Sequence, residues 1–214
     1  MTYTVERPMR VAVLASGGGT NLQALLDACH ARSPARVVLV LSDQANAGAL
    51  ERARAADVEA LHLADPADGA ALERALAQRH VDLVVLAGYL KLVPANVVAA
   101  FADRMINIHP ALLPAFGGTG MYGLRVHRAV LAAGATLSGA SIHLVTPEYD
   151  RGPIVAQWPV PVKPGDTAEA LAARVLEVEH RLLPAVVLAA ATAGRVVPLF
   201  PSRDFGGPTL TPDT

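Results

Sequence analysis

Short continuous runs of apolar residues alternate along the first half of the chain with segments whose apolar residues recur at helical spacing. The continuous runs, which predict strands, cover 11–15, 36–41, 59–63 and 81–87. The segments between them, which predict helices, begin at Leu22, run through 50–55 and cover 68–79. Continuous rather than alternating hydrophobicity indicates strands that are buried on both faces of a parallel sheet. Strands and helices in alternation predict right-handed crossover units.

The second half of the chain mixes other patterns. Strands are predicted up to His109, at 138–145 and at 154–162, with a last strand at 195–197. Helices are predicted at 94–101, at 126–133 and from 166 to 191, the last kinked or divided at Pro184. The strands 138–145 and 154–162 flank the turn 146–153, so we expect them to pair antiparallel. Prolines in the later strand favour a position at the sheet edge.

These elements predict a single α/β domain of Rossmann-like architecture. The expected sheet is open, twisted and mostly parallel, with helices on both faces and an antiparallel edge formed by the C-terminal strands. We expect the domain to cover 1–197, with an N-terminal half at about 10–103 and a C-terminal half at about 104–197. Residues 198–214, rich in Pro, Gly and Thr, are expected to form a loose tail.

Composition narrows the class of protein. Hydrophobic residues make up 52% and charged residues 17%, so a sizeable core is available. A net charge of −1 gives no footprint for nucleic acid or an anionic membrane. Cys29 is the only cysteine, which excludes an intramolecular disulfide or a Cys-based zinc site. Without a signal-peptide segment or a run of transmembrane length, we expect a soluble cytoplasmic protein that acts on small molecules as a monomer or homodimer.

The Gly-rich turn Ser16–Asn21 joins the first predicted strand to the first predicted helix. The free N–H groups at a helix N-terminus form an anion site, and Thr20 or Asn21 could cap this helix. The pattern is neither a dinucleotide-binding fingerprint nor a Walker A loop. A tight turn alone would also recruit glycine, but the flanking elements favour phosphate binding.

Asn107 and His109 lie two residues apart in an apolar run that stops at Pro110, so they project from the same face of a strand end. Asp150 and His143 are also expected at strand ends or in the turn between strands. An amide, an imidazole and a carboxylate suit acyl transfer, since the first two can stabilise an oxyanion and the third can accept a proton. A buried, structurally satisfied Asn and His, or a metal site of two histidines and a carboxylate, are the alternatives.

Longer motifs carry a resemblance over about residues 10–197. They are Val11-Ala-Val-Leu-Ala-Ser-Gly-Gly-Gly-Thr-Asn-Leu-Gln23, Asp82-Leu-Val-Val-Leu-Ala-Gly-Tyr-Leu90, Ile106-Asn-Ile-His-Pro-Ala-Leu-Leu-Pro114, Ser141–Thr146 with Asp150–Ile154, and 173–180. In these motifs the chain resembles the folate-dependent phosphoribosylglycinamide formyltransferases. The resemblance implies transfer of a formyl group from 10-formyltetrahydrofolate, as co-substrate, to the amine of 5-phosphoribosylglycinamide, a step of purine synthesis, with no metal.

The resemblance also assigns roles. It implies Asn107, His109 and Asp150 as catalytic residues, with Ser141 and His143 supporting them. Gly18, Gly19, Thr20 and Asn21 would bind the substrate phosphate, and Gly88 and Glu179 the rest of that substrate. Leu90, Lys91, Leu92, Val93, Thr146, Glu148 and Tyr149 would bind folate. The N-terminal half would then bind phosphate, and the C-terminal half would carry the folate site and the catalytic residues.

In the expected mechanism, the substrate amine attacks the formyl carbon beside Asn107 and His109. Asp150 is expected to raise the pKa of His109, to keep it charged and to relay a proton through a water. The loop Phe116–Gly123 departs from the shorter segment of many family members and resembles a Gly-Gly-Lys-Gly-Met-Tyr-Gly variant, with Thr119 in place of Lys. If that Lys touched phosphate, the N–H groups of Gly117 and Gly118 would have to compensate.

Two other functions fit parts of the pattern. Another user of 10-formyltetrahydrofolate, a transferase or a hydrolase, would share the Asn-x-His-Pro motif. A non-catalytic nucleotide-binding domain would keep only the Gly-rich turn, and it would not require Asn107, His109 and Asp150 to converge.

Overall fold

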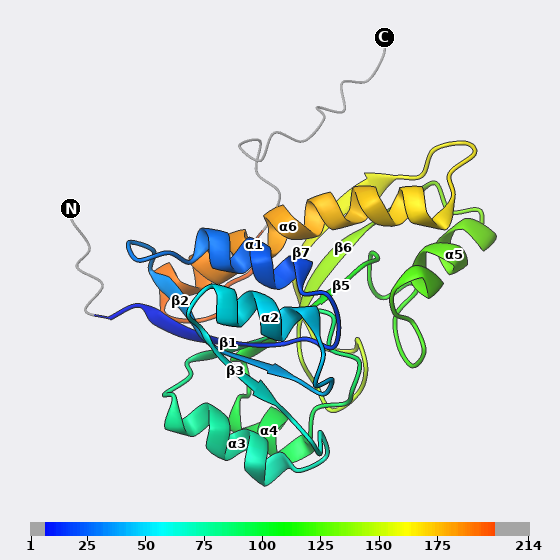
Figure 1. The fold of residues 1–214 in the computed structure, drawn as a ribbon. Coiled ribbons are helices and arrows are strands. Elements are labelled where there is room, and N and C mark those ends of the chain that lie inside the picture. The colour runs from blue at the N-terminus through cyan, green and yellow to red at the C-terminus, as the bar shows by residue number, and fades with distance from the viewer. Residues whose placement is uncertain (1–6, 200–214) are drawn as a thin grey trace.

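A seven-stranded sheet forms the centre of the computed structural model, which describes residues 7–199 (Figure 1). The strand order is β3-β2-β1-β4-β5-β6-β7. The strands are β1 (Met9–Leu14), β2 (Ala35–Ser42), β3 (Glu59–His62), β4 (Leu83–Leu86), β5 (Met105–His109), β6 (Leu137–Leu144) and β7 (Ile154–Pro161). β1 to β5 are parallel, whereas β6 pairs antiparallel with both β5 and β7. The predicted fold class is confirmed.

Helices cover both faces of this sheet (Figure 1). They are α1 (Thr20–Ala28), α2 (Gly48–Ala55), α3 (Gly69–Gln78), α4 (Ala95–Ala100), α5 (Leu124–Ala132) and α6 (Ala168–Ala193). α1, α2 and α6 pack against one face, and α3 and α4 pack against the other. α5 lies beyond the sheet beside the first half of α6.

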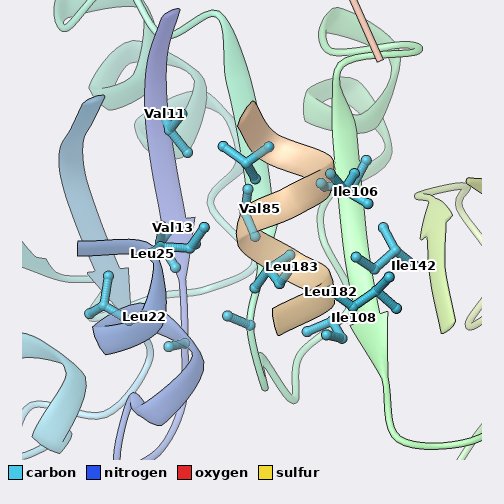
Figure 2. Close-up of a cluster of buried hydrophobic side chains, with 14 of the residues drawn as sticks. Val11, Val13, Leu22, Leu25, Val85, Ile106, Ile108, Ile142, Leu182 and Leu183 are labelled. Atoms are coloured by element: carbon cyan, nitrogen blue, oxygen red, sulfur yellow. The ribbon is translucent and has the colours of Figure 1, made fainter. Parts of the chain in front are cut away.

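The two faces of β1 supply two separate hydrophobic clusters. Val11 and Val13 face Leu25 of α1 and Leu183 of α6 (Figure 2). Ala12 and Leu14 face the opposite cluster, which includes residues of α3 and α4. These four side chains of β1 are fully buried, which explains the unbroken apolar run in the sequence.

The order of the parallel strands reverses between β1 and β4, and the segments that follow these two strands meet there. The Ser16 N–H donates to the Gly88 carbonyl over 3.0 Å, and the Leu90 N–H donates to the Ser16 hydroxyl over 2.9 Å. Ligands of open α/β sheets bind at such a switch point, outside the carboxyl ends of the strands.

Three local expectations are wrong. Residues 195–197 form no strand. Gly194 ends α6 in a left-handed conformation, and residues 195–197 then pair with no strand of the sheet. Pro184 does not divide the last helix, since the residues around it are buried against the sheet and packing outweighs the lost hydrogen bond, whereas a kink there stays a prediction. Neither Thr20 nor Asn21 caps α1, because Gly19 occupies the N-cap position.

The expected loose tail from 200 onward lies outside the described residues. No helix between residues 7 and 199 is long and apolar enough to cross a membrane.

Candidate active site

The pairing register between the carboxyl end of β5 and β6 determines which side chains meet at the site. Asn107 lies opposite His143, and His109 lies opposite Ser141. Because residues two apart on a strand share a face, these four side chains project to the same side of the sheet. The sequence predicted the shared face of Asn107 and His109, and the antiparallel register adds His143 and Ser141 to it.

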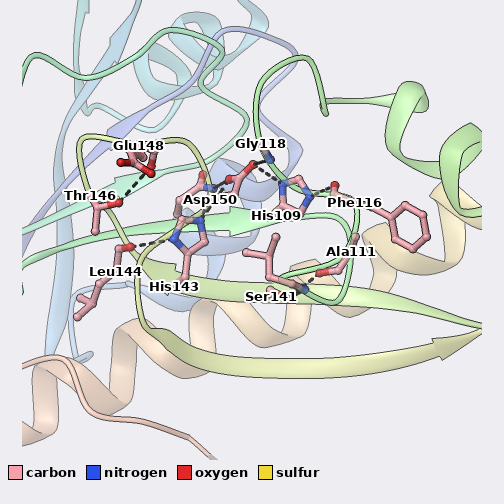
Figure 3. A network of polar contacts seen from close by, with 12 residues as sticks. His109, Ala111, Phe116, Gly118, Ser141, His143, Leu144, Thr146, Glu148 and Asp150 are labelled. Atoms are coloured by element: carbon pink, nitrogen blue, oxygen red, sulfur yellow. Dashed lines mark hydrogen bonds and ion pairs between the residues drawn. The ribbon is translucent and has the colours of Figure 1, made fainter.

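Asp150 reaches this group from the turn between β6 and β7 (Figure 3). Its Oδ1 accepts a hydrogen bond from Asn107 Nδ2 over 3.3 Å and lies 3.4 Å from His143 Nε2. Its Oδ2 lies 3.5 Å from His109 Nδ1 and accepts the Gly118 N–H over 2.8 Å. Asp150 has φ 55°, an uncommon conformation that aspartate tolerates better than most residues. The predicted catalytic trio therefore converges around one carboxylate.

His143 fixes the orientation of the Asn107 amide. His143 Nδ1 lies 2.8 Å from the Leu144 carbonyl, which can only accept, so this nitrogen carries the proton. In the neutral ring, Nε2 then accepts a hydrogen bond from Asn107 Nδ2 over 3.0 Å. The remaining N–H of Asn107 makes the longer contact to Asp150.

His109 is almost completely buried, with 3% of its surface exposed. Burial lowers its pKa and outweighs the opposing effect of the Asp150 charge, so the expectation of a raised pKa is wrong. Its Nε2 donates to the Phe116 carbonyl over 2.8 Å. The 3.5 Å gap from Nδ1 to Asp150 is longer than a charge-assisted hydrogen bond, as a neutral ring requires. Burial raises the pKa of Asp150, but its contacts with His143, His109 and the Gly118 N–H outweigh burial and keep the pKa below its usual value.

Ser141 supports the segment that follows His109. Its hydroxyl donates to the Ala111 carbonyl over 2.6 Å and accepts the Leu113 N–H over 3.0 Å. Gln157 of β7 donates to the same hydroxyl over 2.8 Å. Ser141 is fully buried and does not face the pocket, so it positions the chain beyond β5.

The Gly-rich turn after β1 presents unpaired N–H groups. No hydrogen bond within the described chain uses the backbone N–H of any residue from 17 to 22. Gly19 has φ 73°, and a Cβ added there would lie 2.7 Å from the Ala49 Cα, so only glycine fits. Such a run of free N–H groups at a helix N-terminus suits an anion.

Glu179 of α6 lies next to this turn. Asn21 Nδ2 donates to Glu179 Oε2 over 2.7 Å. Burial raises the pKa of Glu179 to about 7, against the effect of the Asn21 hydrogen bond. A carboxyl that titrates near neutrality can be an acceptor or a donor toward a ligand.

One cavity of about 740 Å³ joins these parts. This volume lies in the range of small-molecule sites. Its walls contain most of the predicted site residues: Asn21, Gly88, Leu90, Lys91, Leu92, Val93, Asn107, His109, His143, Thr146, Glu148, Tyr149, Asp150 and Glu179. Gly18, Gly19 and Thr20 do not line it but lie immediately before Asn21.

The loop 116–123 contributes its backbone to the site. Phe116 gives its carbonyl to His109, and Gly118 gives its N–H to Asp150. A Cβ on Gly117 would lie 2.4 Å from Leu113, so the loop packs closely here. The Gly118 N–H is therefore used by Asp150, so of the two N–H groups that would have to compensate for a phosphate-binding lysine, only that of Gly117 stays a prediction.

Sequence reasoning missed His127 and Tyr89. His127 of α5 lines the cavity, is 4% exposed and has a buried Nδ1 without a partner. Tyr89 also lines the cavity, and burial raises its pKa to about 12. His127 lies on the covered face of α5 with Val126 and Val130, and its local sequence does not separate it from other helical residues.

No group of three His, Cys, Asp or Glu side chains within 7–199 has the arrangement of a metal site.

Residues 9–187 match the protein family described as Formyl transferase. The chain is 46% identical to a chloroplastic phosphoribosylglycinamide formyltransferase of Arabidopsis thaliana over 85% of this chain and 65% of that protein. It is 39% identical to a phosphoribosylglycinamide formyltransferase of Haemophilus influenzae over 83% of this chain and 85% of that protein. The crystal structure of glycinamide ribonucleotide transformylase 1 from Symbiobacterium toebii is 44% identical, with a TM-score of 0.81, over 89% of this chain and 94% of that one.

Proposed function

The chain belongs to the formyl transferase family, and we propose that it transfers the formyl group of 10-formyltetrahydrofolate to the amine of 5-phosphoribosylglycinamide. The relatives named above support this choice of substrate. The observation that carries the proposal is the convergence of Asn107 and His109 on Asp150, in one cavity with Asn21 and Glu179.

Two donors suit the charge that develops on the formyl oxygen. One is the Asn107 N–H that makes only a 3.3 Å contact to Asp150, and the other is the His109 Nε2–H. The Phe116 carbonyl accepts a hydrogen bond from the second donor, so substrate binding would displace this carbonyl. Donors fixed in a dry site are worth far more than donors in water. Asn107 is held by His143, so it loses little freedom when the formyl group arrives.

Asp150 is the proton acceptor of the proposed reaction. Its lowered pKa keeps it ionised at neutral pH. As the amine attacks, its proton passes to Asp150, directly or through a water, and then to the departing folate nitrogen. His109, neutral at that pH because burial lowers its pKa, serves as a hydrogen-bond donor rather than a standing cation.

The apolar mouth of the cavity suits a pteridine ring and its linker. Leu90 and Leu92 are about half exposed there, at 47% and 48%, and Val93 is buried behind them. Lys91 adds a positive charge on the same segment, suited to a carboxylate of the folate tail. Thr146, Glu148 and Tyr149 also line the cavity. At the other end, the free N–H groups from Gly18 to Asn21 would bind the substrate phosphate, and Glu179 and Gly88 the ribosylglycinamide part.

We also propose one functional domain over 1–197, acting on small molecules and not on nucleic acid, in the cytoplasm, as a monomer or homodimer. The net charge of −1 supports the absence of nucleic acid. Because the Arabidopsis relative is named chloroplastic, location requires a direct test by fractionation of the source cells. Sedimentation would measure the oligomeric state.

An acceptor panel tests the proposed function. The purified chain is given 10-formyltetrahydrofolate with 5-phosphoribosylglycinamide, methionyl-tRNA, an amino sugar or water alone. We expect formylated product only with 5-phosphoribosylglycinamide. Preferred formylation of another acceptor, or release of formate alone, would overturn the assignment in favour of another formyltransferase or of a hydrolase.

A further inference from the structure

The carbonyl groups of the three glycines in the Gly-rich turn each accept a hydrogen bond from α1 or α2. The Gly17 carbonyl accepts the Ala49 N–H over 3.1 Å, and the Gly19 carbonyl accepts the Gln23 N–H over 2.9 Å. The Gly18 carbonyl accepts the Nε–H of Arg52 over 2.8 Å. Backbone groups of α1 and α2 therefore fix two of the three carbonyls, and one side chain fixes the third.

Each tied carbonyl determines where the next N–H points. In a planar trans peptide, the C=O of one residue and the N–H of the next residue point in opposite directions. The N–H groups of Gly18, Gly19 and Thr20 are consequently directed away from the groups that hold the carbonyls. These are the N–H groups that remain unpaired within the described chain, and successive free N–H groups form an anion-binding concavity.

The side chain of Arg52 fixes one of these orientations, that of the peptide between Gly18 and Gly19. Its Nη1 donates to Gln23 Oε1 over 3.0 Å, so the guanidinium bridges the turn and α1. The bridge holds the planar group still while its Nε–H contacts Gly18. A cation on a carbonyl also polarises the peptide, which strengthens the N–H on the other side as a donor.

We propose that Arg52 is a positioning residue for phosphate recognition, which orients and polarises the peptide between Gly18 and Gly19 from behind. The inference rests on the proposed function only for the identity of the whole substrate. It predicts that Arg52 contributes to affinity for a phosphate ester without touching it. Lys is a poor replacement, because it keeps the charge but cannot reach both acceptors in a fixed fork.

Arg54 offers a matched control on the same helix. Its side chain is exposed and makes no hydrogen bond or ion pair with residues 7–199. Arg54→Gln removes the same charge from α2 as Arg52→Gln does, but it leaves the turn untouched. A difference between the two variants therefore reports the contacts to Gly18 and Gln23 and not the net charge.

The test measures binding of ribose 5-phosphate by calorimetry to the full-length chain and its Arg52→Gln, Arg52→Lys and Arg54→Gln variants, with folding checked by circular dichroism. We expect Arg52→Gln to weaken binding about tenfold, the scale of a charge-assisted hydrogen bond. Arg52→Lys should fall between it and the wild type, and it carries the test if Arg52→Gln fails to fold. Arg54→Gln should change the dissociation constant by about twofold at most, as for an ordinary surface substitution.

A folded Arg52 variant that binds ribose 5-phosphate as tightly as the wild type, or no more weakly than Arg54→Gln, would overturn the inference. In the transfer assay the effect should appear in KM for 5-phosphoribosylglycinamide and leave kcat nearly unchanged, which a general loss of structure would not produce. The binding measurement needs no formyl transfer. A wild type that binds ribose 5-phosphate in an Arg52-dependent way but forms no formylated product would contradict the proposed function alone.

Discussion

Asn21 donates its side-chain amide to Glu179 over 2.7 Å, joining the first turn of α1 to the middle of α6. The two residues are 158 positions apart in the chain, and both line the cavity. The contact connects the predicted phosphate site to a buried acidic side chain that lines the cavity. It also leaves Glu179 with one hydrogen bond for a buried carboxyl, and this gives the site a pH dependence.

Stability should fall with rising pH because of Glu179. Its pKa is raised from 4.5 to about 7 in the folded chain, so between these values the folded state binds more protons than the unfolded state. Its favourable contribution is therefore complete below about pH 4.5 and lost as pH rises through about 7, a change on the order of 3 kcal/mol. Urea unfolding between pH 5 and pH 8 should show the wild type losing stability relative to Glu179→Gln. A constant difference across this range would contradict the assignment.

Asn107→Ala should lower kcat by about 10²–10³, because it removes a donor to the developing oxyanion. The KM for folate should change little, since Asn107 is not among the residues proposed to bind folate, such as the Leu90–Val93 segment. Steady-state kinetics with both substrates measure the two effects. Asn46→Ala, at an exposed position, is the control and should behave as wild type. Equal kcat values for the two variants would remove Asn107 from the mechanism.

Gly19→Ala should destabilise the chain by about 1–3 kcal/mol, because alanine is strained at φ 73° and its Cβ would collide with Ala49. Gly17→Ala is the matched change in the same turn, where no atom lies within 4 Å of an added Cβ. Urea unfolding midpoints of the two variants give the comparison. If Gly17→Ala were the more damaging substitution, the described conformation of the turn would be incorrect.

Ser141→Ala should cost about 1–3 kcal/mol of stability, because the buried Leu113 N–H loses its acceptor and the Gln157 amide keeps only its hydrogen bond to the Leu113 carbonyl. Ser138 lies on the same strand and is equally buried, but its hydroxyl has no partner. Ser138→Ala should therefore be neutral or stabilising. Thermal unfolding of the two variants distinguishes them, and a larger loss for Ser138→Ala would refute the role given to Ser141.

The fold and the family could be predicted from the sequence because the signals are local. The unbroken apolar runs at 11–15 and 81–87 predict strands buried on both faces, and the prolines of 154–162 predict an edge strand; both are confirmed. The family prediction rested on contiguous motifs and is confirmed by the match over 9–187. The spacing of Asn107 and His109 correctly placed them on one face.

The electrostatics of the site depended on tertiary packing that no motif encodes. Asp150 was expected to raise the pKa of His109, but the burial of His109 outweighs that charge. His127 carried no local signal strong enough to separate it from other helical residues. Arg52 was part of an ordinary helical stretch, and only the turn packed on α2 gives it a partner. The residue roles themselves remain predictions.

Asp150→Asn provides the most direct test of the central claim. Asparagine keeps the size of the side chain and an acceptor for the Gly118 N–H, but it cannot take up the amine proton. Formation of formylated 5-phosphoribosylglycinamide is followed under saturating substrates for the wild type and this variant. We predict rapid product formation by the wild type and a loss of at least about 10² in kcat for the variant. A folded Asp150→Asn chain with a kcat near that of the wild type would contradict the claim.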